Sequence, residues 1–440
     1  MNISNITVGL LTLGCKVNQY ESEAIAELIE KKGFIISDIN KPCTAYIINT
    51  CTVTAESDRK ARQAIRKMIA KNPKAFILVT GCYAQLSADA IAKIEGVDYI
   101  CGNTNKLSTV SYLCSLLERG EKNGQAEICV PSLDGADFEN MSIKHFERTR
   151  AYVKIEDGCE SKCAYCTIPM ARGDIRSKPF DKVITEVKEL VDGGCREIVL
   201  TGIETGSYGK DLLKGEDLAS LLCEIDKIKG IGRVRLGSLD PTVIKPDFVE
   251  KIKNLKCLAP HFHLSLQSGS SKILAKMKRK YNAEQAMRSI ALLREAIPHV
   301  QFTTDIIVGF PDETEDDFLQ SCEFAKRAGF LMIHVFPYSK RKGTPAALMT
   351  DQIDDTVKKD RVHRLSQISC QIRDRILNEK IKNDGTVTVL FESFKDGYAY
   401  GHTAEFIEVK VKSEKLLHAV FRTVRLISHT QEYAEGVLLD

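Results

Sequence analysis

Short apolar runs alternate with amphipathic stretches along most of this chain, and this alternation limits the possible folds more than any other feature. Apolar runs of strand length that are followed by helical patterns indicate βα units and a parallel sheet. The first series covers about residues 1–117 and predicts an open, mostly parallel sheet. Its expected strands are 6–13, 45–49, 75–80 and 97–100, and its expected helices include 21–31 and about 55–70.

A second series of strand–helix units covers about residues 146–375. Its expected strands are 151–155, 197–201, 233–237, 261–266, 302–308 and 332–336, with helices such as 181–191 and 316–328 between them. Six such units predict a partial (β/α)6 barrel, whose chemistry belongs at the C-terminal ends of the strands. Residues 118–145 between the two series are polar and contain scattered glycines, which is typical of a linker.

The pattern changes after a charged helical stretch that ends near residue 382. Alternating residues predict strands at 386–391, 398–402, 406–411 and 419–427, and a small closed antiparallel β-barrel over residues 376–440. Basic and aromatic side chains interleave here, at Phe394, Lys395, Tyr398, Tyr400, His402, Lys410, Lys412, Arg422 and Arg425. Such a face can bind phosphates and unstacked bases, although an ordinary solvated barrel face remains the alternative.

The composition indicates a globular protein with several domains. The 440 residues are 43% hydrophobic and 28% charged, and the net charge is only +3, so a nucleic-acid surface would have to be a local patch. Residues 1–5 carry no basic cluster, and no apolar run approaches the roughly 18 residues of a membrane span. The fifteen cysteines are odd in number and lack the spacing of a stapled secreted domain. We therefore expect a cytoplasmic protein with reduced thiols, several of which bind metal.

Three cysteines lie close together in the loop that follows the first strand of the second series. Cys159, Cys163 and Cys166 are separated by three and then two residues. Zinc sites usually close with four ligands, and no fourth Cys or His lies nearby. Three thiolates on a 4Fe–4S cluster would instead leave one iron open for a small molecule. A zinc loop or three unrelated core cysteines are the alternatives.

Three further cysteines each follow a predicted strand of the first series and precede a helix. Because the carboxyl ends of parallel strands meet at one sheet edge, we expect Cys15, Cys51 and Cys82 to converge there. A helix N-terminus also favours the thiolate, so a second three-thiol cluster is predicted. The alternative is that these are small buried apolar residues, as we expect for Cys43, Cys114 and Cys129. Cys101 also ends an apolar run and could supply a fourth ligand.

These motifs resemble a known family. The Cys159 loop resembles the signature of radical S-adenosylmethionine enzymes, and residues 12–22 (TLGCKVNQYES), 49–51 (NTC) and 80–82 (TGC) resemble the N-terminal domain of the methylthiotransferase family. The form CKVNQYES is similar to the MtaB-type branch. The resemblance implies an auxiliary 4Fe–4S cluster on Cys15, Cys51 and Cys82, with no role for Cys101. It also implies a C-terminal TRAM domain that binds RNA.

The resemblance also implies residues that bind S-adenosylmethionine. Residues 201–204 (TGIE) resemble the family's Gly-Gly-Glu-like element, and residues 306–311 (IIVGFP) resemble the segment beside the adenine. The family continues that second segment as Phe-Pro-Gly-Glu, whereas this chain has Asp312 in place of the glycine. The expected cofactor-binding residues are Gly202, Glu204, Ser238, Ser265, Gln267, Arg279 and Val308.

The activity that the resemblance implies is methylthiolation of C2 of N6-threonylcarbamoyladenosine at position 37 of tRNA. It requires two 4Fe–4S clusters, a 5′-deoxyadenosyl radical and two molecules of S-adenosylmethionine per turnover. We expect the tRNA anticodon stem-loop and an electron donor such as flavodoxin or ferredoxin as partners, no membrane contact, and a monomer. The alternatives are methylthiolation of a ribosomal-protein aspartate, as in a sister branch, and a non-catalytic RNA-binding iron–sulfur protein.

Overall fold

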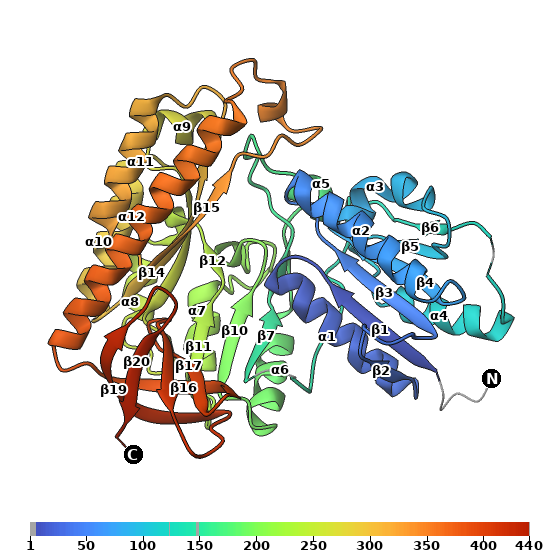
Figure 1. The fold of residues 1–440 in the computed structure, drawn as a ribbon, viewed down its shortest axis with the longest axis horizontal. Coiled ribbons are helices and arrows are strands. Elements are labelled where there is room, and N and C mark those ends of the chain that lie inside the picture. The colour runs from blue at the N-terminus through green and yellow to red at the C-terminus, as the bar shows by residue number, and fades with distance from the viewer. Residues whose placement is uncertain (1–5, 123, 147–148, 440) are drawn as a thin grey trace.

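The computed structural model describes residues 6–122, 124–146 and 149–439 and shows three domains in chain order (Figure 1). An N-terminal α/β domain, a central α/β domain and a small C-terminal β-barrel follow one another. In the described part of the chain, no helix has both the length and the apolar character needed to cross a membrane. Residues 1–5, on which the expectation of no targeting segment partly depends, lie outside the described residues.

The N-terminal domain is built on a parallel six-stranded sheet in the order β2-β1-β3-β4-β5-β6. Its strands are β1 (Thr7–Thr12), β2 (Ile35–Ser37), β3 (Ala45–Thr50), β4 (Phe76–Gly81), β5 (Tyr99–Cys101) and β6 (Glu127–Cys129). Its helices are α1 (Lys16–Lys31), α2 (Ala55–Lys71), α3 (Cys82–Ala92) and α4 (Ser108–Arg119). Separate apolar clusters bury the sheet from its two sides. The predicted parallel sheet is confirmed, and β6 adds an edge strand from within the segment expected to be a linker.

The central domain is a partial barrel of six strand positions (Figure 1). Its strands are β7 (Arg150–Lys154), β10 (Glu197–Thr201), β11 (Arg233–Leu236), β12 (Ser238–Leu239), β13 (His261–Gln267), β14 (Gln301–Val308) and β15 (Met332–Pro337). Only Gly237 separates β11 from β12, so these two form one interrupted strand. All neighbouring pairs among these strands are parallel, as a (β/α)6 barrel requires.

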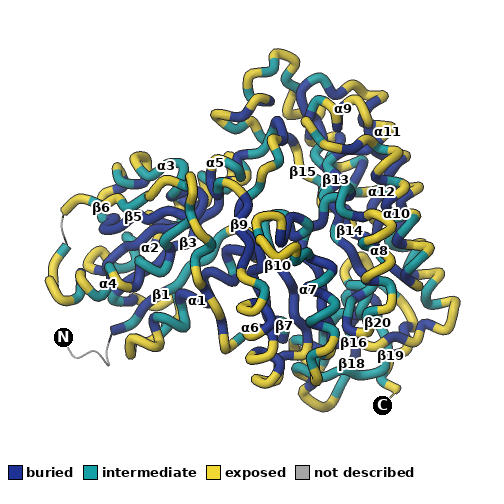
Figure 2. The backbone as a smooth tube through the Cα atoms, turned by 180° about the vertical axis from the view of Figure 1, so that it is seen from behind, coloured by how far each residue is buried: buried dark blue, intermediate teal, exposed yellow. Residues whose placement is uncertain are grey.

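Helices cover the outer surface of this barrel. They are α6 (Phe180–Asp192), α7 (Leu218–Ile225), α8 (Pro246–Ile252), α9 (Ser271–Lys276), α10 (Ala283–Ala296) and α11 (Glu315–Ala328), with 3-10 helices at Thr205–Ser207, Pro241–Val243 and Pro345–Leu348. Local sequence fixes where they start, because α10 and α11 open with reciprocal capping boxes at Asn282–Gln285 and Thr314–Asp317. The strands of this domain are mostly buried, whereas the outward-facing turns of its helices are exposed (Figure 2). The loop after β7 contains β8 (Glu156–Asp157), α5 (Ile168–Arg172) and β9 (Arg176–Ser177).

The long helix α12 (Asp355–Lys382) leads into a closed five-stranded barrel in the order β16-β17-β18-β20-β19. Its strands are β16 (Thr386–Lys395), β17 (Tyr398–Thr403), β18 (Glu408–Lys412), β19 (Val420–His429) and β20 (Ala434–Leu438). The closed barrel was expected, but the prediction that it is antiparallel throughout is wrong, because β18 and β20 pair in parallel. An odd number of strands cannot close a ring with every neighbour reversed, and the fifth strand, β20, had not been predicted.

The C-terminal barrel docks against the N-terminal ends of the central strands. Arg150 at the start of β7 pairs with Glu392 at 3.0 Å, and Arg235 on β11 donates to the carbonyl oxygens of Thr403 and Ala404. These contacts close one end of the partial barrel. The C-terminal strand ends remain open toward the N-terminal domain.

Candidate active site

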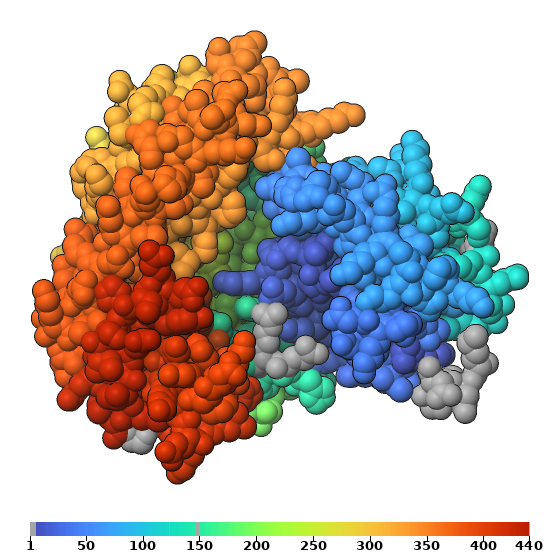
Figure 3. Space-filling view, viewed as in Figure 1, coloured from blue at the N-terminus to red at the C-terminus, as the bar shows by residue number. Residues whose placement is uncertain are grey.

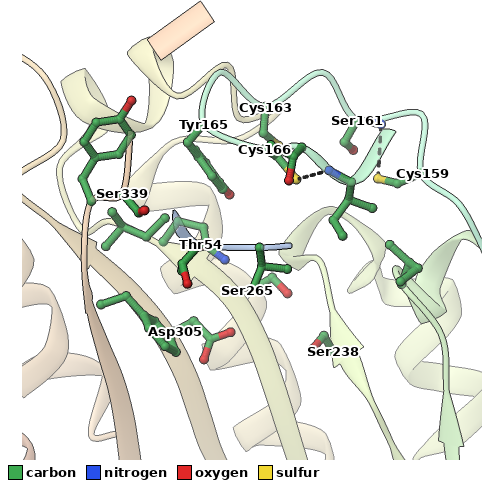
Figure 4. Close-up of a pocket in the computed structure, with 18 of the residues that line it drawn as sticks. Thr54, Cys159, Ser161, Cys163, Tyr165, Cys166, Ser238, Ser265, Asp305 and Ser339 are labelled. Atoms are coloured by element: carbon green, nitrogen blue, oxygen red, sulfur yellow. Dashed lines mark hydrogen bonds between the residues drawn. The ribbon is translucent and has the colours of Figure 1, made fainter. Parts of the chain in front are cut away.

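The first thiol triad lies in the loop between β7 and α5 (Figure 4). The backbone enters this loop at Gly158, whose φ of +85° suits glycine. Each sulfur accepts one N–H: Cys159 from the Ser161 amide at 3.3 Å, Cys166 from the Ile168 amide at 3.4 Å, and Cys163 from Arg279 Nη1 at 3.2 Å. Hydrogen bonds to sulfur favour the thiolate, which is the form that binds metal. Burial outweighs them without metal, because it raises the pKa of Cys159 and raises that of Cys166 to about 12.

The loop forms one wall of a pocket of about 350 Å³ at the C-terminal ends of the barrel strands. Of the residues expected to bind S-adenosylmethionine, the structure brings five to this pocket: Glu204, Ser238, Ser265, Gln267 and Arg279. Gly202 and Val308 do not line it, and Ile307 does. In Figure 4 the three cysteines lie on the loop above Ser238, Ser265 and Asp305, which come from the strands below.

The N-terminal domain completes this chamber. Val53 and Thr54, which follow Cys51, line the same pocket as the Cys159 loop, and residues 336–339, at the end of β15 and directly after it, also line it. Figure 3 shows the hollow between the blue N-terminal domain and the orange part of the central domain, with green residues at its floor. The pocket is therefore shared between the two α/β domains.

Buried carboxyl groups surround the element at residues 202–204. The Glu204 amide donates to Glu156 Oε2 at 2.9 Å, and a Cβ on Gly202 would lie only 2.6 Å from that oxygen, so the close approach requires glycine. Burial raises the pKa of Glu156 well above its usual value. Removal from water, and then the charge of Asp240, raise the pKa of Glu204 to about 7. A carboxylate at this position can attract a ligand ammonium group.

Arg279 is held in place from several sides. It pairs with Asp240 at 2.5 Å, donates to the Ser265 carbonyl at 2.9 Å, and lies over the ring of Tyr281. Together with its bond to Cys163, these contacts occupy much of the guanidinium. Arg279 therefore connects the thiol loop to the strand ends of the barrel.

The second triad assembles at the carboxyl edge of the N-terminal sheet. Cys15 is the N-cap of α1, Cys51 directly follows β3, and Cys82 is the first residue of α3. Gly14 has a φ of +109°, and a Cβ there would lie 2.8 Å from that of Cys51, so the first two loops touch. Burial, followed by the nearby thiols of Cys82 and Cys15, raises the pKa of Cys51 to about 11. The fold thus brings together three thiols that are far apart in sequence.

The other cysteines of this domain pack in its core. Cys101 is fully buried in the apolar cluster around Tyr99, and burial raises the pKa of its thiol to about 12. Cys43, Cys114 and Cys129 pack in or against the same two apolar clusters, as expected. This core position does not support a role for Cys101 as a fourth ligand of the cluster.

The two thiol triads fit iron–sulfur clusters better than single metal ions. Within residues 6–122, 124–146 and 149–439, no three His, Cys, Asp or Glu side chains converge closely enough to hold one metal ion. Thiolates that bind different irons of one cluster need not converge on a single point, and an all-sulfur donor set is typical of iron–sulfur sites.

Sequence reasoning missed the contacts that join the two domains around the chamber. Arg172 at the end of α5 is fully buried and pairs with Glu21 of α1 at 2.9 Å. On the opposite side, Arg341 pairs with Asp58 at 2.8 Å and donates to Thr52 at 2.7 Å. The only sequence signal for these contacts was the position of Arg172 inside the cysteine loop. The spacing of residues does not show that Arg172 is buried.

Comparison with known proteins identifies the family. The chain matches the Radical SAM superfamily over residues 153–325 and the Uncharacterized protein family UPF0004 over residues 7–102. It is 39% identical over 437 residues to the threonylcarbamoyladenosine tRNA methylthiotransferase MtaB of Bacillus subtilis, which covers 98% of this chain and 96% of that protein. The chain belongs to the radical S-adenosylmethionine methylthiotransferase family.

Other relatives agree with this assignment. The chain is 36% identical over 365 residues to the tRNA-2-methylthio-N(6)-dimethylallyladenosine synthase of Carboxydothermus hydrogenoformans, with 82% of each chain covered. The solved structure of the radical S-adenosylmethionine methyltransferase TsrM from Kitasatospora setae shares the fold, with a TM-score of 0.57 and 14% identity over 78% of this chain and 77% of that chain. The protein is therefore a radical S-adenosylmethionine enzyme, and its family implies a 4Fe–4S cluster and S-adenosylmethionine as cofactors.

Proposed function

We propose that this methylthiotransferase inserts a methylthio group at C2 of N6-threonylcarbamoyladenosine at position 37 of tRNA. The observation that carries the proposal is the shared chamber: one pocket is lined by the Cys159 loop and by Val53 and Thr54, which adjoin Cys51 of the second triad. A reaction that needs two iron–sulfur sites around one substrate requires such a chamber. The proposed domains are 1–117 for the auxiliary site, 146–375 for the radical site and 376–440 for RNA, with 118–145 between the first two.

The C2–H bond of adenine carries no acidic proton, so a radical is a reasonable way to activate it. Cys159, Cys163 and Cys166 would hold a 4Fe–4S cluster that would supply the electron for cleavage of S-adenosylmethionine to a 5′-deoxyadenosyl radical, and Cys15, Cys51 and Cys82 would hold an auxiliary cluster at which the sulfur would be presented. A second S-adenosylmethionine supplies the methyl group, and a flavodoxin or ferredoxin supplies electrons. The protein's own task is to bind, orient and exclude water.

In this proposal the strand ends of the central barrel orient S-adenosylmethionine. Glu204 attracts the methionyl ammonium group, and Ser238, Ser265 and Gln267 offer hydrogen bonds to the ribose or carboxylate. Gly202 supports this site from outside the pocket lining, since it makes room for the carboxyl group of Glu156. The expected role of Val308 beside the adenine stays a prediction. Arg279 holds the Cys163 sulfur by its hydrogen bond.

In this proposal the C-terminal barrel binds RNA as a TRAM-like domain. Its β17–β18 face alternates aromatic and basic residues, because Tyr398 pairs with Lys412 and Tyr400 pairs with Lys410. The Lys410 ammonium lies 4.3 Å from the centre of the Tyr398 ring. Such a face can contact the phosphates and bases of an anticodon stem-loop, whose base must unstack at a cost of about a few kcal/mol. His402 has a different role, since its ring bonds Glu392 within the barrel at 2.9 Å, and Glu392 also pairs with Arg150 of the central domain.

The choice of threonylcarbamoyladenosine rests on the relative from Bacillus subtilis and on the CKVNQYES motif at residues 15–22. The relative from Carboxydothermus hydrogenoformans makes dimethylallyladenosine the main rival substrate. The aspartate of a ribosomal protein is the rival from the sister branch.

The test is anaerobic reconstitution with iron and sulfide, followed by reaction with anticodon stem-loops that carry adenosine, dimethylallyladenosine or threonylcarbamoyladenosine. Mass spectrometry of the nucleosides should show a methylthio gain on threonylcarbamoyladenosine. A gain on the dimethylallyl substrate alone would refute the proposed substrate. Ribosomal protein incubated in parallel and analysed by peptide mass spectrometry should gain nothing, and a gain there alone would also refute it.

A further inference from the structure

A buried ion network joins the loop of the first triad to the helix that presents the second. The side chain of Arg172 is fully buried. Its Nη1 donates to Glu21 Oε1 at 2.9 Å and to Asp157 Oδ1 at 2.8 Å, and its Nη2 donates to Asn18 Oδ1 at 2.7 Å. Asn18 and Glu21 belong to α1, which begins directly after Cys15. One guanidinium therefore fixes the two cluster loops relative to each other.

This network contains more cations than ionised carboxylates. Lys106 pairs with Glu21, and Lys154 pairs with Glu21 at 2.8 Å and with Asp157 at 2.6 Å. Together with Arg172, three buried cations share two carboxylates. Because an uncompensated charge in a protein interior is strongly unfavourable, this excess requires a further anion nearby.

Three further groups border the network. Burial raises the pKa of Glu156 well above its usual value, which favours its neutral form. The Glu139 carboxylate accepts the Leu107 amide at 2.9 Å and lies near Lys106 and Lys154, whereas Arg176 adds a further cation 3.6 Å from Asp157. With Glu139 counted as an anion and Arg176 as a cation, four cations still face three carboxylates.

Arg172 has one unused donor, and its charged side chain lies near the auxiliary thiols Cys82 and Cys15. The Nε of Arg172 is buried and has no hydrogen-bond partner among the described residues. Helix α3, which begins at Cys82, packs against α5, and Cys15 Sγ donates to the same Asn18 oxygen that Arg172 contacts. Although burial opposes it, Asp157, then Cys82, and then Glu21 raise the pKa of Arg172 well above its usual value. The geometry and the charges both place Arg172 beside the second triad.

We propose that Arg172 is a positioning residue for the auxiliary cluster, that its free Nε–H donates to a sulfur of that site, and that its charge balances an anionic cluster. The inference rests on the proposed function, in which Cys15, Cys51 and Cys82 hold that cluster. A hydrogen bond and a positive charge directed at cluster sulfur stabilise the reduced, more negative state. Arg172 thereby raises the reduction potential of the auxiliary cluster.

The test isolates the auxiliary cluster in a full-length chain whose Cys159, Cys163 and Cys166 are all replaced by alanine. After anaerobic reconstitution, iron is counted, and the potential is measured by redox titration followed by electron paramagnetic resonance. In this background Arg172→Gln should make the potential more negative by roughly 59 mV or more. For one electron, this shift corresponds to a change of at least about tenfold in the equilibrium constant of reduction. Arg172→Lys keeps the charge but lacks the Nε donor, and its potential should lie between the two.

Arg235→Gln is the matched control, because Arg235 is likewise buried and pairs with a buried carboxylate, Glu197, but it contacts the C-terminal barrel rather than the auxiliary site. Its auxiliary potential should equal that of the unsubstituted background. The shift caused by Arg172→Gln should also be smaller in the reciprocal chain, in which Cys15, Cys51 and Cys82 are alanine and only the radical cluster remains.

Unchanged potentials in both Arg172 variants at full iron content would overturn the inference, as would an equal shift of the two clusters. If Arg172→Gln does not retain iron, Arg172→Lys decides alone: a potential more negative than that of the background chain supports the inference, and the background value overturns it. A different failure, no iron in the background chain with Arg172 intact, would refute the proposed auxiliary site itself.

Discussion

The two thiol triads reach the same chamber by different routes. Cys159, Cys163 and Cys166 lie in one loop, so their proximity follows from the short spacing between them. Cys15, Cys51 and Cys82 come from three strand ends, and only the order β1-β3-β4 in the parallel sheet brings them together. The first triad is a local feature of the sequence, whereas the second depends on the tertiary fold.

This difference has a consequence for substitutions. A change at a cysteine of the Cys159 loop should affect the radical site alone, whereas Arg172, farther along the same loop, acts on the auxiliary site. A change in the packing of the N-terminal strand ends should affect the auxiliary site alone, even where it removes no cysteine. The predictions below test this separation, beginning with the largest effect.

Replacing Cys163 with alanine should abolish 5′-deoxyadenosine formation, because two thiolates do not hold a 4Fe–4S cluster with one open iron. Liquid chromatography after addition of dithionite and S-adenosylmethionine measures the product. The variant should retain about four irons per chain from the auxiliary site. Normal yield of 5′-deoxyadenosine would contradict the role assigned to Cys163.

Replacing Cys51 with alanine should give the complementary result. Iron should fall to about one 4Fe–4S cluster per chain, 5′-deoxyadenosine should still form, and no thiolated nucleoside should appear. Cys101→Ala is the matched control, since this buried thiol packs in the apolar core and should leave the iron content unchanged. An unchanged iron count in the Cys51 variant would rule out the auxiliary site.

Replacing Gly14 with alanine should weaken the auxiliary site without removing a ligand. The positive φ costs about 1–2 kcal/mol for a residue with a Cβ, and the new methyl group would press on Cys51. Auxiliary iron should fall while 5′-deoxyadenosine formation persists. Gly135→Ala is the control, because Gly135 also has a positive φ but its Cβ would meet nothing within 4 Å. Equal iron loss in both variants would show that backbone strain alone explains the effect.

The smallest predicted effect is a pH dependence of S-adenosylmethionine binding. Because the pKa of Glu204 is raised to about 7, its carboxylate becomes neutral as the pH falls through that value and no longer attracts an ammonium group. Affinity should weaken below pH 7 by up to about tenfold per unit in the wild type and stay flat in Glu204→Gln. Equilibrium binding between about pH 6 and 7.5 measures this, and identical pH profiles would exclude Glu204 from the binding site.

The sequence predicted the buried parallel strands well, because continuous apolar runs identify them. Residues 197–201 match β10 residue for residue. The edge strands β2 and β6 were missed because they are three residues long and largely exposed, so they carry no clear apolar pattern. The same limit applies to β20, whose five residues become a strand only when the barrel closes.

The ionic part of the site could not be predicted in the same way. Spacing identified the cysteines, and the resemblance identified five residues that line the pocket. Lys154 and Arg172 are charged residues that become buried only because Glu21 approaches them from another domain. Such pairs depend on long-range packing, so local sequence patterns cannot predict them.

The most direct test of the shared chamber is a crystal structure of the iron-loaded protein grown without oxygen. The account predicts two clusters, one on Cys159, Cys163 and Cys166 and one on Cys15, Cys51 and Cys82, both facing the pocket between Val53 and Ser265. A single cluster, or a second cluster that faces away from that pocket, would contradict it.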